Sequence, residues 1–217
     1  MIVLGVLASG GGTNLQAILD AIAAGQLDAR VGVVVSNVPG AGALARARAA
    51  RVHTVIVEHG AFADRGSFDA AVVGARRSHG VELVVLAGFM RLVTDVLLDA
   101  FPWRVVNVHP ALLPAFPGVH AQRQALEYGV RLTGCTVHFV DRGTDTGPIV
   151  AQAVVPVLEG DDEEALRSRI LVREHELLPR VLQWIAEGRV TVEPPPAQGA
   201  RARVRVRGVG AAVHAGS

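Results

Sequence analysis

Asn107 and His109 lie two residues apart, near the end of an apolar run, in the segment "NVHPALLPAFPGVHA". An amide that donates hydrogen bonds and an imidazole that exchanges a proton are side chains suited to acid–base chemistry. Because side chains alternate along a strand, a strand over residues 105–108 directs both toward one face. The alternative is that the two polar groups only satisfy nearby backbone groups. Residues of restricted or special backbone geometry follow and predict a rigid loop that holds an active site in place: Pro110, Pro114, Pro117 and Gly118.

The segment "ASGGGTNLQ" follows the first apolar run and is a candidate anion site. Glycines before Thr13 and Asn14 at a helix start expose backbone N–H groups beside the positive end of the helix dipole. The third glycine of a dinucleotide fingerprint is absent, and "VVVSN" offers no acidic residue to a ribose, so a monophosphate fits better than NAD. A tight turn with an ordinary helix cap is the alternative.

Three other segments contribute candidate polar residues. "DRGTDTG" contains Asp141 and Asp145, although an aspartate among glycines also forms simple turns. "LAGFMRLV" places Met90 and Arg91 after another apolar run, on the same rim. Glu174 falls on an apolar helical stripe, so its carboxylate needs a partner in the protein or in a ligand. The stripe comprises Leu166, Ile170, Leu177, Val181 and Ile185.

The residue content disfavours several other chemistries. All 21 basic residues are arginine, which excludes a Schiff-base lysine and the lysine of a P-loop. We expect no metal site, because HExxH and CxxC are absent and a loop separates His109 from His120. Cys135 alternates with Val137 and Phe139, so we expect it to face the core rather than act as a nucleophile.

The elements that must position these residues alternate along the chain. Apolar runs at 2–7, 31–35, 54–57, 83–86 and 105–108 are separated by helical patterns at 14–24, 42–50 and 67–78. This alternation predicts an α/β fold with a Rossmann-like parallel sheet, in which ligands bind beyond the carboxyl ends of the strands. "CTVHFV" and "PIVAQAVVPV" predict an antiparallel pair, followed by a helix from Asp161 to about Gly188 in which Pro179 introduces a kink. Two short strands around a proline-rich loop, and then a frayed tail, are expected at the end.

Length, charge and cysteine content set the class of protein. The 217 residues fit one domain, no apolar run reaches the roughly 18 residues of a membrane span, and the first residues resemble a strand rather than a signal peptide. A single cysteine fits a reducing compartment, so we expect a cytoplasmic protein with no membrane partner. Four arginines and no acid follow Pro194, which leaves the rest at a net charge of −3 and argues against a nucleic-acid partner.

Several segments together, in order, resemble the folate-dependent phosphoribosylglycinamide formyltransferase family of purine biosynthesis. They are "SGGGTNLQAI", "SN", "LAGFMRL", "NVHPALLPAFPGVHA" and "GCTVHFVDRGTDTGPIVAQ". The resemblance runs from about residue 2 to 192 and implies a formyltransferase domain over 1–192, with 193–217 a loop, short strand and flexible tail. It implies transfer of the formyl group of 10-formyltetrahydrofolate, the co-substrate, to the amine of glycinamide ribonucleotide, by a monomer or homodimer.

The resemblance also implies roles for individual residues. Asn107, His109 and Asp145 match the catalytic trio. Substrate binding is implied for Gly12, Thr13 and Asn14 (phosphate), Glu174 (ribose), and Met90 and Pro110 (amine, through their backbones). Folate binding is implied for Arg65, Arg91, Leu92, Val93, Asn107, Val140 and Asp141. One departure is Leu171, where relatives often have Lys or Gln; Arg169 or Arg173 could replace that phosphate contact.

The chemistry suits these residue types. Attack of an amine on the formyl carbon forms an oxyanion, to which Asn107 and a protonated His109 can donate, with Asp145 keeping the imidazole charged. Asp145 and a water can carry the proton from the amine to the folate nitrogen. Related hydrolases and tRNA formyltransferases carry further domains that we do not expect here, and a mere nucleotide-binding module would leave the trio unexplained.

Overall fold

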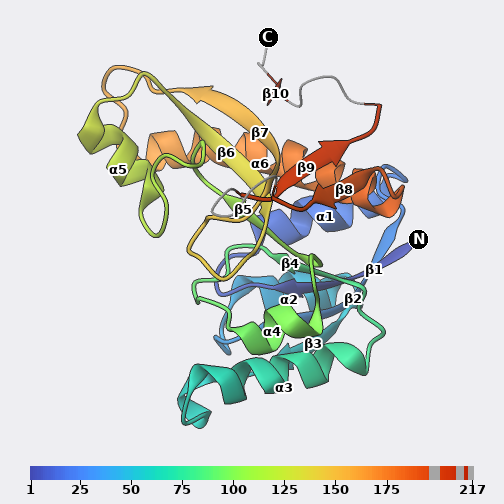
Figure 1. Ribbon diagram of the computed structural model, residues 1–217. Coiled ribbons are helices and arrows are strands. Elements are labelled where there is room, and N and C mark those ends of the chain that lie inside the picture. The colour runs from blue at the N-terminus through green and yellow to red at the C-terminus, as the bar shows by residue number, and fades with distance from the viewer. Residues whose placement is uncertain (196–200, 209–212, 215–217) are drawn as a thin grey trace. The chain divides into compact units, whose positions relative to one another are not determined.

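The computed structural model describes residues 1–195, 201–208 and 213–214, drawn in colour in Figure 1. The chain divides into two compact units, Met1–Asn107 and Val108–Ser217. Each unit is described by itself.

The first unit is built on parallel strands that are continuous apolar runs. Its strands are β1 (Ile2–Leu7), β2 (Ala29–Ser36), β3 (His53–Ile56), β4 (Leu83–Leu86) and the first three residues of β5 (Val105–His109). They lie in the order β5-β4-β1-β2-β3, and every pair is parallel. All four residues of β4 are buried, as expected for a parallel strand covered on both faces.

Helices connect these strands. They are α1 (Thr13–Ala23), α2 (Gly42–Ala49), the 3₁₀ turn η1 (His59–Ala61), α3 (Arg65–Arg77) and α4 (Asp95–Ala100). α1 buries Leu15, Ile18 and Ala21, one stripe at helical spacing. The sequence predicts α1, α2 and α3 to within two residues at each end, but it does not predict α4, whose six residues are too few to show a period.

The second unit contains the antiparallel pair and the long helix that the sequence predicts. β6 (Leu132–Phe139) and β7 (Ile149–Pro156) are antiparallel, with Cys135 opposite Ala153 and Thr136 opposite Gln152. α6 (Glu163–Ala186) lies against both strands (Figure 1). Its first turn is capped by Asp162, whose side chain accepts a hydrogen bond from the backbone N–H of Ala165 at 2.7 Å. The helix continues through Pro179.

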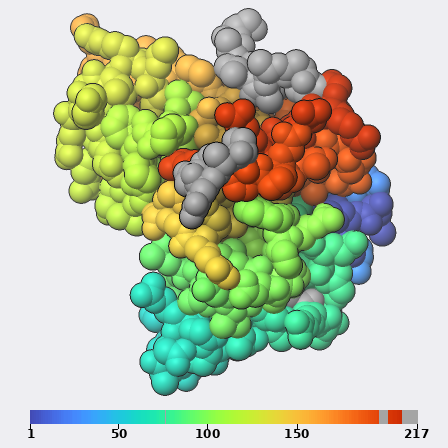
Figure 2. All heavy atoms as spheres, viewed as in Figure 1, coloured from blue at the N-terminus to red at the C-terminus, as the bar shows by residue number. Residues whose placement is uncertain are grey.

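The remaining elements of this unit are shorter. α5 (Ala121–Tyr128) precedes β6 and is absent from the sequence prediction. β8 (Val190–Glu193) and β9 (Arg203–Val206) are the two short strands expected here, and they pair antiparallel; their surface is visible in orange and red in Figure 2. Arg203 and Arg205 are exposed, while Val204 and Val206 are half-buried, the alternation of a one-sided strand. β10 (Val213–His214) runs parallel to β7. The tail expected to be flexible lies largely outside the described residues.

The fold class predicted from the sequence is confirmed. The protein is α/β, with a mostly parallel sheet and additional antiparallel strands toward the carboxyl end. The domain limits at residues 192 and 193 stay a prediction.

A bidentate ion pair anchors the start of α6 and makes stability depend on pH. Arg169 donates to both carboxylate oxygens of Asp161, at 2.7 and 2.8 Å, and the backbone N–H of Leu158 donates to Asp161 Oδ2 at 2.8 Å. These hydrogen bonds, that of Arg169 foremost, lower the pKa of Asp161 to about 2. Since this pKa is depressed in the folded state, the contribution to stability is present above the unfolded pKa of about 3.9 and is lost as pH falls toward 2.

We therefore expect Asp161→Asn to lower the free energy of unfolding at pH 6, and the difference from wild type to shrink between about pH 4 and pH 2. Urea denaturation over this pH range measures it. Arg167→Gln is the control, because it removes only an ion pair with Glu164 on the exposed surface, and such pairs contribute little to stability. Wild-type and Asp161→Asn curves that stay parallel through this window would contradict the assignment.

Candidate functional site

The carboxyl ends of three neighbouring strands of the first unit lie in one row. Leu7 of β1 is in register with Leu86 of β4, which is in register with Asn107 of β5. The glycine loop after β1, the segment containing Met90 after β4, and Asn107 therefore belong to the same edge of the sheet. This is the edge at which ligands bind in parallel α/β sheets, as the sequence predicts.

At one position of the glycine loop, the backbone accommodates only glycine. Gly12 caps α1 with φ of 74°, and a Cβ there would lie 2.6 Å from Ala43 Cα. The loop is tied to α2, because the backbone N–H of Ala43 donates to Gly10 O at 3.1 Å and Arg46 Nε donates to Gly11 O at 2.9 Å. Thr13 and Asn14 form the first turn of α1 directly after this loop. Backbone N–H groups at the start of a helix suit an anion, so the loop and this turn are a candidate anion site.

A serine links three loops at this edge. Ser9 Oγ donates to Asn37 Oδ1 at 2.7 Å and accepts from the backbone N–H of Met90 at 3.1 Å, while the Ser9 N–H donates to Gly88 O at 3.1 Å. Asn37 is the asparagine of the "SN" segment and is buried. Ser9 and Asn37 thus fix the backbone of Met90, a role that the sequence alone does not reveal.

The segment after β4 is open to solvent around Met90. The side chains of Met90 and Leu92 are 77% and 57% exposed. The guanidinium of Arg91 lies over the Phe68 ring, 5.0 Å from its centroid, which holds the arginine beside these apolar groups. Val93 is half-buried and Arg65 is exposed at the start of α3.

In the second unit, Asp145 lies between two imidazoles. His109 Nδ1 is 3.4 Å from Asp145 Oδ2, and His138 Nε2 is 3.6 Å from Asp145 Oδ1. The side chain of Asp145 is 13% exposed, and both histidines are almost fully buried. Asp145 has φ of 54°, in the left-handed region that aspartate tolerates better than most residues. His109 and Asp145 were predicted to work together, and the structure brings them together; His138 was missed.

The proline-rich loop 110–120 closes over this cluster. Phe116 O lies 2.8 Å from His109 Nε2, and the backbone N–H of Gly118 donates to Asp145 Oδ2 at 2.7 Å. A carbonyl oxygen only accepts, so His109 Nε2 carries a hydrogen. The Asp145 carboxylate lies beside Nδ1, so both ring nitrogens of His109 face oxygen acceptors.

The beginning of this loop is held by side chains of the antiparallel strands. Thr136 Oγ1 donates to Ala111 O at 2.6 Å and accepts from the backbone N–H of Leu113 at 3.0 Å. Gln152 Nε2 donates to Leu113 O at 2.9 Å. Leu113–Pro114 is a cis peptide bond. The prolines therefore act together with a polar network inside the sheet to fix the loop.

Asp141 forms a turn, which is the alternative that the sequence offers for an aspartate in the segment "DRGTDTG". Its Oδ1 accepts hydrogen bonds from Gly143 N–H at 3.1 Å and Thr146 Oγ1 at 2.6 Å. These bonds shape the turn from which Asp145 projects. Val140 and Asp141 are both half-buried.

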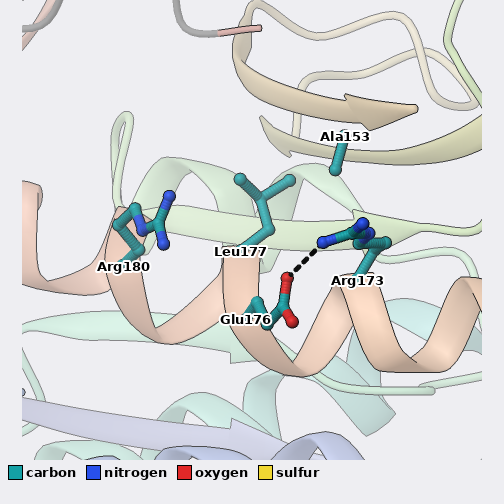
Figure 3. Close-up of a pocket in the computed structure, with 5 residues that line it drawn as sticks. All are labelled: Ala153, Arg173, Glu176, Leu177 and Arg180. Carbon is teal, nitrogen blue, oxygen red and sulfur yellow. Dashed lines mark hydrogen bonds and ion pairs between the residues drawn. The ribbon is translucent and has the colours of Figure 1, made fainter. Parts of the chain in front are cut away.

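Glu174 is buried on α6, 4% exposed, on the apolar stripe that the sequence predicts. Of the two arginines considered for the missing phosphate contact, Arg169 is committed to Asp161. Arg173 donates to Glu176 at 2.9 Å and lines a small pocket (Figure 3). Ala153, Glu176, Leu177 and Arg180 complete the lining of this pocket.

Two alternative chemistries have little support in the described part of the chain. Cys135 is fully buried, and burial raises the pKa of its thiol to about 12, so it is a poor nucleophile. Within residues 1–195, 201–208 and 213–214, no three His, Cys, Asp or Glu side chains are grouped as metal ligands. No helix among these residues has the length and apolar character needed to cross a membrane.

The geometry of the glycine loop predicts a position-specific effect on stability. Gly12→Ala should lower the free energy of unfolding by about 1–3 kcal/mol, because the new Cβ meets the α2 backbone and the positive φ is strained. Gly10→Ala is the matched control, since nothing lies within 4 Å of its Cβ position and its φ is not positive. Denaturant unfolding compares the two variants. Equal losses at both positions would contradict this account of the loop.

Comparison with known proteins agrees with this arrangement. Residues 3–182 match the family described as "Formyl transferase". A phosphoribosylglycinamide formyltransferase from Mycobacterium tuberculosis is 49% identical over 189 residues, covering 86% of each protein. The trifunctional purine biosynthetic protein adenosine-3 from Drosophila melanogaster is 44% identical over 87% of this chain, which spans only 14% of that relative. The crystal structure of glycinamide ribonucleotide transformylase 1 from Symbiobacterium toebii superposes with a TM-score of 0.89 at 52% identity, covering 95% of this chain and 94% of that one. This chain belongs to the formyl transferase family.

Proposed function

We propose that this protein transfers the formyl group of 10-formyltetrahydrofolate to the amine of glycinamide ribonucleotide in purine biosynthesis. The observation that carries the proposal is the pairing of His109 with Asp145, since His109 lies beside Asn107 in sequence at the end of β5. The chain is also similar to enzymes named for this reaction. We also infer that the enzyme works in the cytoplasm, where the free Cys135 stays reduced. A monomer or homodimer stays a prediction.

Asn107 and His109 are assigned to the oxyanion that forms when the amine attacks the formyl carbon. Asn107 is half-buried and would donate a side-chain N–H. His109 Nε2 carries a hydrogen but directs it at Phe116 O. Donation to the oxyanion therefore requires that the substrate oxygen take the place of this carbonyl, while Asp145 beside Nδ1 keeps the ring oriented.

Asp145 is assigned to the proton. The attacking amine must lose a proton and the folate nitrogen must gain one, and a carboxylate with a water can serve both transfers. Asp145 is held by the Gly118 N–H and by the turn that Asp141 shapes, so it is oriented before substrate arrives. These steps need no covalent enzyme intermediate.

Substrate binding is assigned to backbone groups and one buried carboxylate. The monophosphate would bind at the start of α1, to Gly12, Thr13 and Asn14. The amine would be held by the backbones of Met90 and Pro110. Glu174 would bind the ribose hydroxyls. Arg173 is the better candidate for an outer phosphate contact, because its pair with Glu176 is half exposed and weak, whereas Arg169 is held by two short bonds.

The folate is assigned to the segment after β4 and to the turn after β6. The exposed apolar side chains of Met90 and Leu92, beside an arginine held on an aromatic ring, fit a flat, partly apolar ligand with polar edges. The residues proposed to bind it are Arg65, Arg91, Leu92, Val93, Asn107, Val140 and Asp141.

The direct test is an assay with purified protein and 10-formyltetrahydrofolate. We expect tetrahydrofolate to appear only when glycinamide ribonucleotide is present, together with the formylated ribonucleotide. Release of formate without the ribonucleotide would indicate a hydrolase, and formylation of methionyl-tRNA would indicate a different transferase. Either result in place of ribonucleotide formylation would refute the proposal.

Steady-state kinetics test the roles of the trio. Asn107→Ala or His109→Ala should lower kcat by about 10²–10³-fold, the loss typical of one oxyanion donor. The double variant His109→Ala/Asp145→Ala should lose far less than the product of the single effects, because Asp145 acts partly through His109. His59→Ala, in the exposed η1 turn, is the control and should keep wild-type kcat. A folded His109→Ala protein with normal kcat would remove His109 from the mechanism.

A further inference from the structure

The segment between β4 and α4 contains most of the residues of the first unit that are assigned to folate. Residues 87–94 form neither helix nor strand, and the side chains of Met90 and Leu92 are exposed. An irregular, exposed segment has a single backbone conformation only when other elements anchor it. The side chains that anchor this segment are therefore candidates for a role in folate binding.

The segment is tied at both ends by side chains from other elements. At one end, the Met90 N–H donates to Ser9 Oγ at 3.1 Å, in the loop after β1. At the other end, Asp69 of α3 holds Thr94. Asp69 Oδ2 accepts the backbone N–H of Thr94 at 2.5 Å and the Thr94 hydroxyl at 2.8 Å. α3, which contains Asp69, packs against α4, which follows Thr94 (Figure 1).

Asp69 is a costly residue to bury, because it is only 3% exposed in the apolar face of α3. A buried carboxylate has lost much of its hydration, and protein donors must replace the water. Hydrogen bonds to a charged acceptor are stronger than those between neutral groups. Both donors described above belong to Thr94, so these bonds hold the segment after β4 rather than the helix that contains Asp69.

The hydroxyl of Thr94 does not serve the helix that it precedes. Thr94 is the N-cap residue of α4, but among the described residues its side chain makes no capping hydrogen bond. Its carbonyl oxygen accepts from the N–H groups of Leu97 and Leu98 instead. Loss of the hydroxyl therefore leaves the start of α4 unchanged and removes a bond to Asp69.

The residue before Asp69 in α3 holds the middle of the same segment. The Phe68 ring is 2% exposed, and the guanidinium of Arg91 lies 5.0 Å from its centroid. An arginine held over an aromatic face keeps its direction. Two consecutive residues of one helix thus fix Arg91 and Thr94, on either side of the two residues between them.

We propose that Asp69 is a positioning residue for folate, which holds residues 90–94 in their binding conformation through Thr94. This inference rests on the proposed formyl transfer. The affinity of a ligand falls with the fraction of protein in the binding-competent conformation, so an anchor that raises this fraction raises the affinity for folate. Met90, which is assigned to the amine of the ribonucleotide, keeps its own bond to Ser9 when Thr94 is released. Loss of the Asp69 anchor should therefore weaken folate binding and spare the ribonucleotide.

Removal of one hydroxyl tests the proposal. Thr94→Val keeps the shape of the side chain and the backbone N–H, and its extended backbone, with φ of −104° and ψ of 173°, suits valine. We expect the Kd for tetrahydrofolate, measured by calorimetry, to rise about 3–10-fold, as for the loss of one hydrogen bond. KM for 10-formyltetrahydrofolate should rise by the same factor, while kcat and KM for the ribonucleotide stay within about twofold of wild type.

Three further variants exclude a merely structural role. Thr94→Ser keeps the hydroxyl and should restore the wild-type Kd for tetrahydrofolate. Asp69→Ala removes the acceptor of both hydrogen bonds and should raise this Kd more than Thr94→Val does. In an Asp69→Ala background, Thr94→Val should raise it no further, since the hydroxyl acts through Asp69. A wild-type Kd in folded Thr94→Val and Asp69→Ala proteins would overturn the proposal.

Ser67→Ala is the matched control. Ser67 donates its N–H at 2.7 Å and its hydroxyl at 3.0 Å to Asp64 Oδ1, the same pattern of two donors on one carboxylate oxygen. These bonds lie at the start of α3 and not in the segment after β4, so Ser67→Ala should leave the Kd for tetrahydrofolate unchanged. A rise as large as that in Thr94→Val would indicate a general effect on α3 and would overturn the assignment to Asp69.

A measurement without ligands separates this proposal from the proposed function. Amide hydrogen exchange at residue 94 should be about 10-fold or more faster in Asp69→Ala than in wild type, because the N–H loses its acceptor, while the Met90 amide stays protected. Unchanged exchange at residue 94 in the folded variant would overturn the proposal even in an active enzyme. If the wild-type protein binds tetrahydrofolate but formylates no ribonucleotide, the proposed function fails, and the calorimetric comparison still decides the role of Asp69.

Discussion

A carboxyl group held between two imidazoles is the constraint on which the second unit depends. Asp145 is only 13% exposed, and a carboxylate with so little water needs partners on both oxygens. The Gly118 N–H and His109 serve Oδ2, and His138 faces Oδ1. These partners come from the end of β5, the loop that follows it and the end of β6, so the placement of one carboxyl group fixes three segments of the second unit.

The loop that closes over Asp145 illustrates why prolines alone do not make a rigid site. Prolines restrict φ but supply no N–H, so they cannot anchor a loop to its surroundings. Here the anchors are Thr136 and Gln152, opposite each other on β6 and β7, which bind the backbone of Ala111 and Leu113. The antiparallel pair thus supports the loop as well as contributing to the sheet. At the edge of the first unit, Ser9 and Asn37 support Met90 in the same manner.

Sequence patterns predicted the parts of this structure that follow from local rules. Continuous apolar runs identified β1 and β4 to the residue, because a strand buried on both faces tolerates nothing polar. Alternation placed Cys135 in the core, and helical spacing placed Glu174 on a buried stripe. The resemblance to a family, rather than any spacing, supplied the substrate and the roles of Asn107 and Asp145.

The elements and residues that the sequence does not predict lack a local signal. α4 has only six residues, too few for a period to show, and α5 begins after His120, whose φ of 58° no sequence rule anticipates. His138 stands among apolar residues of β6, where alternation indicates its face but not what lies opposite. What lies beside His138 is Asp145, seven residues later and after a turn whose shape comes from Asp141. A contact between side chains across such a turn is not revealed by local sequence patterns, even when the two residues are close in sequence.

Asp145 and Asp161 both expose little of their side chains but have different kinds of partner, and the contrast explains why imidazoles lie beside Asp145. Arg169 holds Asp161 with two short hydrogen bonds and lowers its pKa to about 2, so this carboxyl group stays ionised at every physiological pH and serves only structure. A guanidinium beside Asp145 would hold that group in the same fixed state, because arginine does not give up its proton. Imidazoles can orient a carboxylate and still exchange a proton with it near neutral pH. In this chain every basic residue other than histidine is an arginine. An arginine partner therefore keeps a carboxylate ionised, whereas a histidine partner leaves it able to exchange a proton.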